Sequence, residues 1–177
     1  MRTPPLLRTG LPVWAFAVLL VAGLFQGCSH YRLGTDSQPA FHTVYVAPVT
    51  NRTSLPQARD IVSTRIREAF IRDGRVTLVN SPADAEVTLT VAIVDYHRDI
   101  AAVREGDTGL ARKFDLTLGA DCTLTRRDGS VLFEKRRIES RREAFTDTGQ
   151  IQSEYQTLPL LAEALATKVT HAMLDVW

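Results

Sequence analysis

Seven basic side chains lie close together late in the chain and form the densest group of residues that could bind a ligand: Arg126, Arg127, Lys135, Arg136, Arg137, Arg141 and Arg142. Three acidic residues lie among them, at Asp128, Glu134 and Glu139, so the segment has a net charge of +4. An arginine guanidinium forms paired hydrogen bonds with phosphate or carboxylate oxygens. The segment therefore indicates local binding of anions.

The spacing of these cations allows two interpretations. On a strand, Lys135, Arg137 and Arg141 face one way and Arg136 faces the other. Such a ladder could bind the phosphate or sugar-acid groups of an anionic lipid, and the candidate contacts are then Lys135, Arg136, Arg137, Arg141 and Arg127. Alternatively, the charges protect an exposed edge strand from aggregation. The residue pattern alone favours the edge-strand interpretation.

The sequence contains no recognisable motif for catalysis or metal binding. Its four histidines, His30, His42, His97 and His171, are scattered, and there is no His-x-x-x-His or Cys-x-x-Cys spacing. Glycine-rich phosphate loops and the Gly-x-Ser-x-Gly nucleophile elbow are also missing from the sequence. We therefore predict no catalytic residues, no metal and no cofactor, and hence a protein that is not an enzyme.

Residues 1–27 have the order of an export signal. Arg2 and Arg8 precede an uncharged, mostly apolar run of about 15 residues, which is shorter than the roughly 20 residues of a membrane-spanning helix. The sequence Phe25-Gln-Gly-Cys28 that follows resembles the lipobox of bacterial lipoproteins. The resemblance implies that Cys28 carries acyl chains such as palmitate and becomes the new N-terminus, which anchors the protein to a membrane.

Two details bear on this assignment. Phe25 and Gln26 depart from the usual lipobox, so an ordinary secretory peptide with an incidental cysteine is the alternative. Ser29, rather than an aspartate, follows Cys28, which resembles lipoproteins that are sent on to the outer membrane. After the signal, residues 28–40 are expected to form an acylated tether, and residues 41–177 a single domain.

The mature chain is almost neutral. Removing Arg2 and Arg8 leaves 19 basic and 20 acidic residues, a net charge of −1, which argues against a nucleic-acid partner. Only two cysteines are present, so no disulfide framework is indicated, and Cys122 falls on the apolar side of a predicted strand.

The first half of the domain predicts a strand, a turn and a helix. Residues 41–49 are rich in β-branched and aromatic residues, and a turn follows at 51–54. Ser54 and Gln57 have the spacing of a capping box, so we expect the helix to begin there. Apolar residues then recur every three or four positions up to Gly74, which is placed to cap the helix C-terminus.

The second half predicts strands followed by a helix. After a short apolar piece at 76–79, alternation indicates a strand over 87–93, and residues 99–110 resemble a loop. Alternation resumes at 113, and the turn at 127–130 makes residues 113–142 an antiparallel hairpin. A final helix is expected from about 155 to 176, with Pro159 in its first turn or causing a kink.

These elements follow the order strand, helix, strand, strand, strand, helix. A strand that crosses over through a helix to a parallel strand, followed by antiparallel hairpins, gives a mixed sheet. We therefore predict an α+β, two-layer sandwich in which both helices pack on one face of a mixed, roughly four-stranded sheet.

Several features together resemble the LptE family of lipopolysaccharide-assembly lipoproteins. They are Gly27-Cys28 followed by Tyr31-Arg-Leu-Gly34, the strand Val44-Tyr-Val-Ala-Pro-Val49 that leads into a helix, the strand Ala85-Glu-Val-Thr-Leu-Thr-Val91, and the closing hairpin and helix. The resemblance covers essentially the whole mature chain. It implies a non-enzymatic lipoprotein of the outer membrane that faces the periplasm and sits inside the lumen of an LptD-type β-barrel. There it would help the barrel to deliver lipopolysaccharide, which basic residues of the sheet would bind.

The same residues allow a second reading. Val44-Tyr-Val-Ala-Pro-Val-Thr-Asn51 and the helix end Ala69-Phe-Ile-Arg-Asp-Gly-Arg75 also resemble a domain shared by lipoprotein activators of peptidoglycan synthases and curli-secretion proteins. Such a protein would bind periplasmic enzymes or form a secretion pore.

Overall fold

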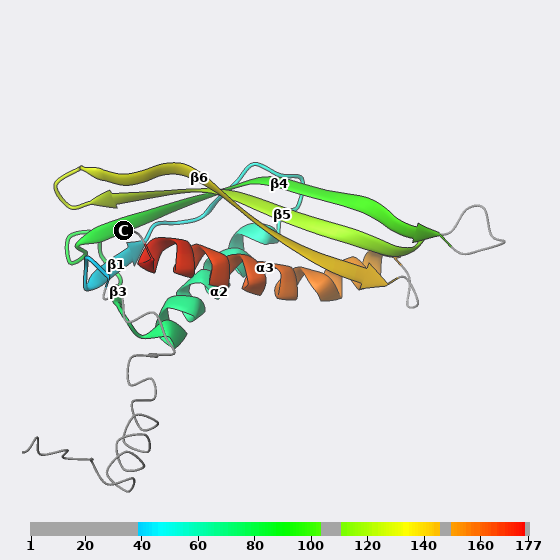
Figure 1. Ribbon diagram of the computed structural model, residues 1–177, viewed down its shortest axis with the longest axis horizontal. Helices are drawn as coiled ribbons and strands as arrows, with labels where there is room; N and C mark the ends of the chain where they lie inside the picture. Colours follow the sequence, from blue (N-terminus) through cyan, green and yellow to red (C-terminus); the bar gives the residue numbers. More distant parts are fainter. Residues whose placement is uncertain (1–38, 104–110, 146–149, 176–177) are drawn as a thin grey trace, which may run out of the picture. The chain divides into compact units, whose positions relative to one another are not determined.

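The computed structural model describes residues 39–103, 111–145 and 150–175. The predicted signal peptide, Cys28 and most of the predicted tether lie outside these ranges. The described residues form one six-stranded sheet and two helices, α2 and α3 (Figure 1). The predicted α+β class with a mixed sheet and two helices is confirmed, although the sheet has more strands than the four expected.

The sheet combines parallel and antiparallel strands. Five of them lie in the order β3-β1-β4-β5-β6, and the short strand β2 also pairs with β4. The strands are β1 (Thr43–Val46), β2 (Thr50–Asn51), β3 (Thr77–Val79), β4 (Val87–Val103), β5 (Ala111–Arg126) and β6 (Val131–Phe145). β1 is parallel to both β3 and β4, whereas β5 is antiparallel to β4 and to β6. The two extra strands are short: β2 overlaps the start of the predicted turn at Asn51, and β3 lies within the apolar piece at 76–79.

Helix α2 (Ala58–Asp73) has the buried face that the sequence predicts. Val62, Ile66 and Phe70 are fully buried, and Gly74 ends the helix in the left-handed region at φ 72°, where its N–H donates to the carbonyl of Phe70. The predicted capping box is wrong, because Gln57 occupies the N-cap without a side-chain hydrogen bond.

Asn51, rather than Ser54, organises the approach to α2. Its Oδ1 accepts hydrogen bonds from the N–H and the hydroxyl of Thr53, at 2.9 and 2.8 Å, and its Nδ2 donates to the carbonyl of Leu55 at 2.8 Å. An asparagine side chain that bonds to the backbone two residues later replaces a backbone turn. The cap signal at Ser54 therefore competed with a stronger turn signal at Asn51.

Strand β4 extends well beyond its predicted end at Ile93. Residues up to Val103 pair with β5, so the part of the predicted 99–110 loop that the structure describes is strand instead. A register shift between Ile93 and Asp95 interrupts the alternation there. The polar sequence beyond the bulge hid the strand, because both of its faces carry charged residues.

The predicted hairpin is confirmed as β5 and β6. Between them, Gly129 has φ 86°, and Asp128 Oδ1 accepts hydrogen bonds from the N–H and the hydroxyl of Ser130 at 2.8 and 2.6 Å. Helix α3 (Gln150–Leu174) begins about five residues earlier than predicted, so Pro159 lies inside it rather than in its first turn. Residues 176 and 177 lie outside the described ranges.

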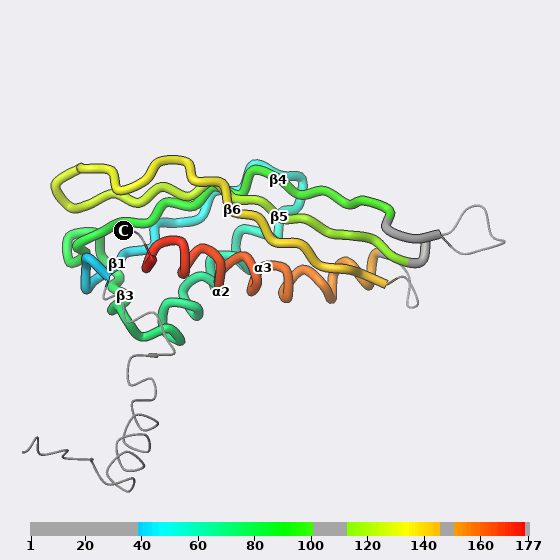
Figure 2. Tube along the Cα trace, viewed as in Figure 1, coloured from blue at the N-terminus to red at the C-terminus, as the bar shows by residue number. Residues whose placement is uncertain are grey.

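Both helices cover the same face of the sheet (Figure 1), and the tube in Figure 2 shows α3 running beneath β5 and β6. Leu116, Leu118 and Ala120 on β5 face the helices and are fully buried. The hydroxyl of Ser140 on β6 donates to the carbonyl of Leu161 on α3 at 2.9 Å. Because side chains alternate along a strand, the neighbouring positions point to the opposite, outer face.

Candidate functional site

The structure divides the five candidate cations among three environments. Arg137 and Arg141 lie on the outer face of β6, and Arg136 turns toward the helices, as the predicted alternation requires. Lys135 sits at an irregular point of the strand, and Arg127 lies in the turn between β5 and β6. The sequence ladder is therefore not one continuous row of free charges.

Arg137 is surrounded by carboxylates from all three long strands. Its guanidinium lies 3.2 Å from Asp95 on β4, 3.4 Å from Asp121 on β5 and 3.0 Å from Glu139 on β6. The hydrogen bond with Glu139, together with the charge of Asp121, raises the pKa of Arg137. The positive charge of Arg137 is thus paired with carboxylates of its own sheet.

Arg141 is paired in the same manner. It contacts Asp115 on β5, a residue that is only 7% exposed. The hydrogen bond from Arg141 lowers the pKa of Asp115, which keeps this covered group charged. On the same face, Lys113 contacts Glu143.

Lys135 is more accessible than Arg137 and Arg141, the two candidate cations on the outer face of β6. Its side chain is 78% exposed, and its Nζ lies 3.8 Å from Glu134, a distance at which a surface pair contributes little. Its backbone has φ 46°, and its N–H donates to the Thr123 hydroxyl at 3.1 Å. The irregularity turns this side chain out of the alternating row.

Arg136 and Arg127 contact other parts of the fold. The Arg136 guanidinium lies 4.5 Å from the centre of the Phe133 ring and donates to the carbonyl of Ala172 at 3.0 Å, near the C-terminal end of α3. The Nε of Arg127 donates to the carbonyl of Ala85 at 2.9 Å. Both side chains therefore have structural roles, and both residues are exposed.

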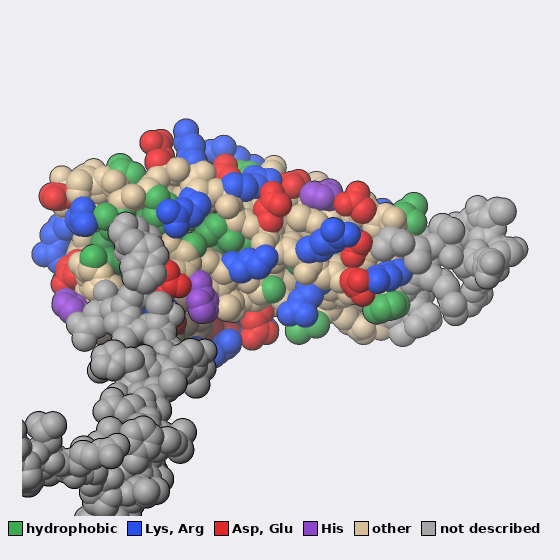
Figure 3. All heavy atoms as spheres, in the orientation of Figure 1, with side chains coloured by type: hydrophobic (Ala, Val, Ile, Leu, Met, Phe, Trp, Pro, Cys, Tyr) green, Lys and Arg blue, Asp and Glu red, His purple; other side chains and the backbone are tan. Residues whose placement is uncertain are grey.

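We use the name "acidic face" for the outer positions of β4 95–99, β5 113–121 and β6 137–143. These positions hold six carboxylates and three cations, a net charge of −3 with His97 neutral: Asp95, Asp99, Asp115, Asp121, Glu139 and Glu143 against Lys113, Arg137 and Arg141. The ring of His97 lies between two of the carboxylates, 3.1 Å from Asp95 and 3.5 Å from Asp99. Figure 3 shows one view of the surface, in which cationic and acidic side chains are interspersed.

Sequence reasoning missed the acidic face because it considered β6 alone. The carboxylates of β5 occupied the polar positions of a well-predicted strand, but those of β4 fell beyond its predicted end. The feature that places them is the bulge after Ile93, which moves Asp95, His97 and Asp99 from the helix-covered face to the outer face.

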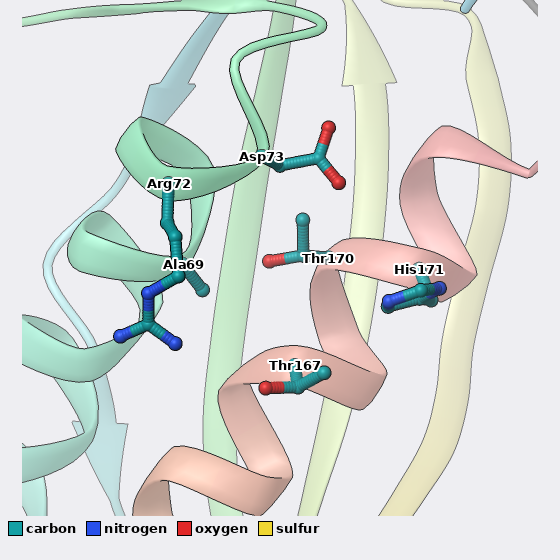
Figure 4. A pocket seen from close by; sticks show the side chains of 6 residues that line it. All are labelled: Ala69, Arg72, Asp73, Thr167, Thr170 and His171. Carbon is teal, nitrogen blue, oxygen red and sulfur yellow. The ribbon is translucent and has the colours of Figure 1, made fainter.

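A second polar site lies between the C-terminal parts of the two helices (Figure 4). A depression of about 220 Å³ is lined by Ala69, Arg72, Asp73, Thr167, Thr170 and His171. Among the described residues, only Thr170 has a buried side-chain oxygen without a hydrogen-bond partner. Beside it, Asp73 and Asp175 both pair with Arg75, at 2.8 and 3.1 Å.

The described residues also bear on three other features: a reactive thiol, a metal site and a membrane-spanning helix. Cys122 is fully buried, as predicted, and this burial raises the pKa of its thiol to about 12. Residues 39–103, 111–145 and 150–175 contain no group of three or more His, Cys, Asp or Glu side chains arranged to hold a metal ion. Neither helix in this part of the chain is long and apolar enough to cross a membrane.

The chain is similar to several solved structures. A protein from Xanthomonas campestris is 13% identical, and the alignment covers 79% of this chain and 88% of that one with a TM-score of 0.57. A minor lipoprotein from Acinetobacter baumannii is 16% identical, with 74% and 91% covered and a TM-score of 0.49. PelC, a dodecamer from Paraburkholderia phytofirmans, is 18% identical, with 80% and 100% covered and a TM-score of 0.49. No curated protein matches the chain.

The comparison with family models is more specific. The model described as "LptE: Lipopolysaccharide-assembly" matches residues 41–173. That range contains all six strands, α2 and almost all of α3. The resemblance inferred from the sequence is therefore confirmed, and the chain belongs to the LptE lipopolysaccharide-assembly family.

Proposed function

We propose that this protein is a non-catalytic lipoprotein of the outer membrane that plugs an LptD-type β-barrel and assists the delivery of lipopolysaccharide to the cell surface. The observation that carries the proposal is the family match over residues 41–173. Binding and positioning suffice for this role, so no chemical step is assigned to any side chain.

The outer face of the sheet supports a position inside a barrel. The lumen of a large membrane barrel is polar and filled with water, in contrast to its lipid-facing surface. Strands β4, β5 and β6 present charged and hydroxyl side chains on that face, including Thr117, Asp121 and Glu139. A plug with such a surface remains hydrated in a polar lumen.

The lipid contact is proposed at the turn between β5 and β6. Residues 126–136 carry four cations and two carboxylates, a net charge of +2: Arg126, Arg127, Lys135 and Arg136 against Asp128 and Glu134. The side chain of Lys135 is more exposed than those of Arg137 and Arg141. Arg137 and Arg141 belong to the same proposed set, but their charges are offset by carboxylates of the sheet. We therefore expect the lipid phosphates to meet Lys135 first.

The anchor is proposed at Cys28, at the end of the predicted signal peptide. Several acyl chains bind a bilayer stably, at about 0.8 kcal/mol for each buried CH₂ group. The anchor would hold the domain at the periplasmic surface of the outer membrane, where it can enter the barrel lumen.

Affinity purification of the full-length chain from detergent-solubilised outer membranes tests the proposal. We expect a large β-barrel protein to co-purify in a stoichiometric amount, and depletion of the chain to lower both barrel assembly and surface lipopolysaccharide. Recovery of a peptidoglycan synthase without a barrel would contradict the proposal and support the alternative of a cell-wall enzyme activator.

A further inference from the structure

We propose that the acidic face docks against a wall of the barrel lumen that presents lysine and arginine side chains. The inference rests on the proposed function and adds to it the docking surface and the chemistry of the partner. It assigns the long strands to protein contact and leaves the turn between β5 and β6 for the lipid.

The charge of this face exceeds what its own cations can offset. Arg137 contacts three carboxylates, from Asp95, Asp121 and Glu139, yet it carries one positive charge. The carboxylate of Asp99 lies 3.5 Å from His97, and its side chain is 67% exposed. Additional cations from a partner would therefore find carboxylates that are only partly compensated.

The pairing of β4 with β5 places two of these carboxylates opposite each other. Asp99 and Asp115 are direct cross-strand partners. Like charges at directly opposite positions destabilise a sheet. Arg141 contacts Asp115 and also interacts electrostatically with Asp99, so one cation serves both carboxylates. A surface that served solubility alone would avoid this arrangement, whereas a surface that receives cations benefits from it.

The side chains of the acidic face are also ordered before any partner binds. A Cβ at position 119 would lie 2.9 Å from Nη2 of Arg137, so the glycine lets the guanidinium lie flat on β5. Ion pairs across three strands then hold the long side chain in one position. Side chains that are already ordered lose less conformational entropy when a partner binds. The result is an ordered surface suited to a broad contact.

The excess negative charge also decides between possible partners. Anionic lipid headgroups would be repelled here, because juxtaposed like charges disfavour binding. The positive segment at residues 126–136 lies at the end of the β5–β6 hairpin, so the two signs occupy different parts of the sheet. A cationic protein surface is the class of partner that the acidic face fits.

A matched pair of full-length variants tests the assignment. Asp99→Lys with Glu143→Lys reverses two charges on the acidic face, and Glu68→Lys with Glu163→Lys makes the same net change on the helices. Each is purified from outer membranes at several salt concentrations, and thermal melting verifies folding. We expect the first variant to lose about tenfold in recovered barrel at low salt, and the control to recover as much as the wild type. A neutral variant, Asp99→Asn with Glu143→Gln, should lose less than the reversal.

The outcomes separate the two proposals. If the wild type recovers the barrel and the reversed variant recovers it equally well, the docking surface is wrong while the proposed function stands. If the wild type recovers no barrel, the proposed function fails and the inference fails with it. Increased binding of the reversed variant to vesicles of anionic phospholipid, with the barrel contact unchanged, would also overturn the assignment.

Discussion

Gly119 on β5 provides the space in which the guanidinium of Arg137 on β6 lies. A Cβ at position 119 would approach Nη2 to 2.9 Å and Cζ to 3.0 Å. Glycine inside a strand is otherwise unfavourable, because it has no side chain to pack against its neighbours and loses more conformational entropy on folding than other residues. Its presence allows Arg137 to cross β5 and reach Asp95 on β4, 3.2 Å away.

The contact between these two residues predicts a coupling in a double-mutant cycle. In the Arg137→Ala background, Gly119→Ala should raise the free energy of unfolding by about 0.5–1 kcal/mol, because alanine restricts the unfolded chain more than glycine does. In the wild type, the new methyl group displaces the guanidinium, so Gly119→Ala should be neutral or destabilising. Urea denaturation of the four proteins measures the difference, and a coupling below about 0.3 kcal/mol would show that the two residues are independent.

The buried thiol of Cys122 predicts how the protein reacts with a thiol reagent. Burial raises the pKa of this thiol to about 12, so it is protonated and inaccessible at neutral pH. If Cys28 is acylated as proposed, the folded full-length protein should release no chromophore from an aromatic disulfide reagent at pH 8. The protein unfolded in guanidinium chloride should release one equivalent. One equivalent from the folded protein and two from the unfolded protein would show that Cys28 is unmodified.

Local patterns predicted the elements whose two faces differ. Strand β5 alternates because its inner residues, such as Leu118, are buried and its outer ones, such as Asp121, are polar. Strand β4 beyond its bulge could not be recognised, because Tyr96 and Arg98 on its inner face are polar as well. Both contact Glu154 on α3, so tertiary contacts, rather than hydrophobic periodicity, hold this part of the strand.

Prediction of the candidate site from the sequence was limited in the same way, because it depended on tertiary contacts. The basic residues of β6 were visible in the sequence, but the charge around them depends on which strands lie beside β6. Asp115 is 26 positions from Arg141 in the chain and contacts it only because β5 and β6 pair. Strand order and register therefore decided that the outer face is net negative, and neither could be obtained from composition.

A paired carboxylate at the end of α2 predicts a pH dependence of stability. The hydrogen bond from Arg75 holds the pKa of Asp73 below its usual value. Since the unfolded carboxyl titrates near pH 3.9, the stabilisation is complete above that pH and is lost as the pH falls through the lower folded pKa. Asp73→Asn should therefore cost about 1–2 kcal/mol at pH 7 and progressively less below pH 4.

Urea midpoints at pH 7, 5, 4 and 3 measure this effect. Asp84→Asn is the control, because this exposed carboxylate has no ion pair in the part of the chain that the structure describes. An equal loss for Asp73→Asn at pH 7 and pH 3 would mean that the contribution of Asp73 is packing rather than charge.

The different environments of Lys135 and Arg137 predict that they differ in lipid binding. Lys135 is 78% exposed with one distant acidic neighbour, whereas Arg137 contacts three carboxylates. A cation near an anionic lipid surface contributes about 1 kcal/mol, so Lys135→Ala should weaken binding to lipopolysaccharide vesicles about fivefold. Arg137→Ala should have a smaller effect, because its charge is already offset. Arg59→Ala on α2 is the matched control and should bind like the wild type. Co-sedimentation at low and high salt measures all three, and a larger loss for Arg137 than for Lys135 would place the lipid on the outer face instead of at the hairpin turn.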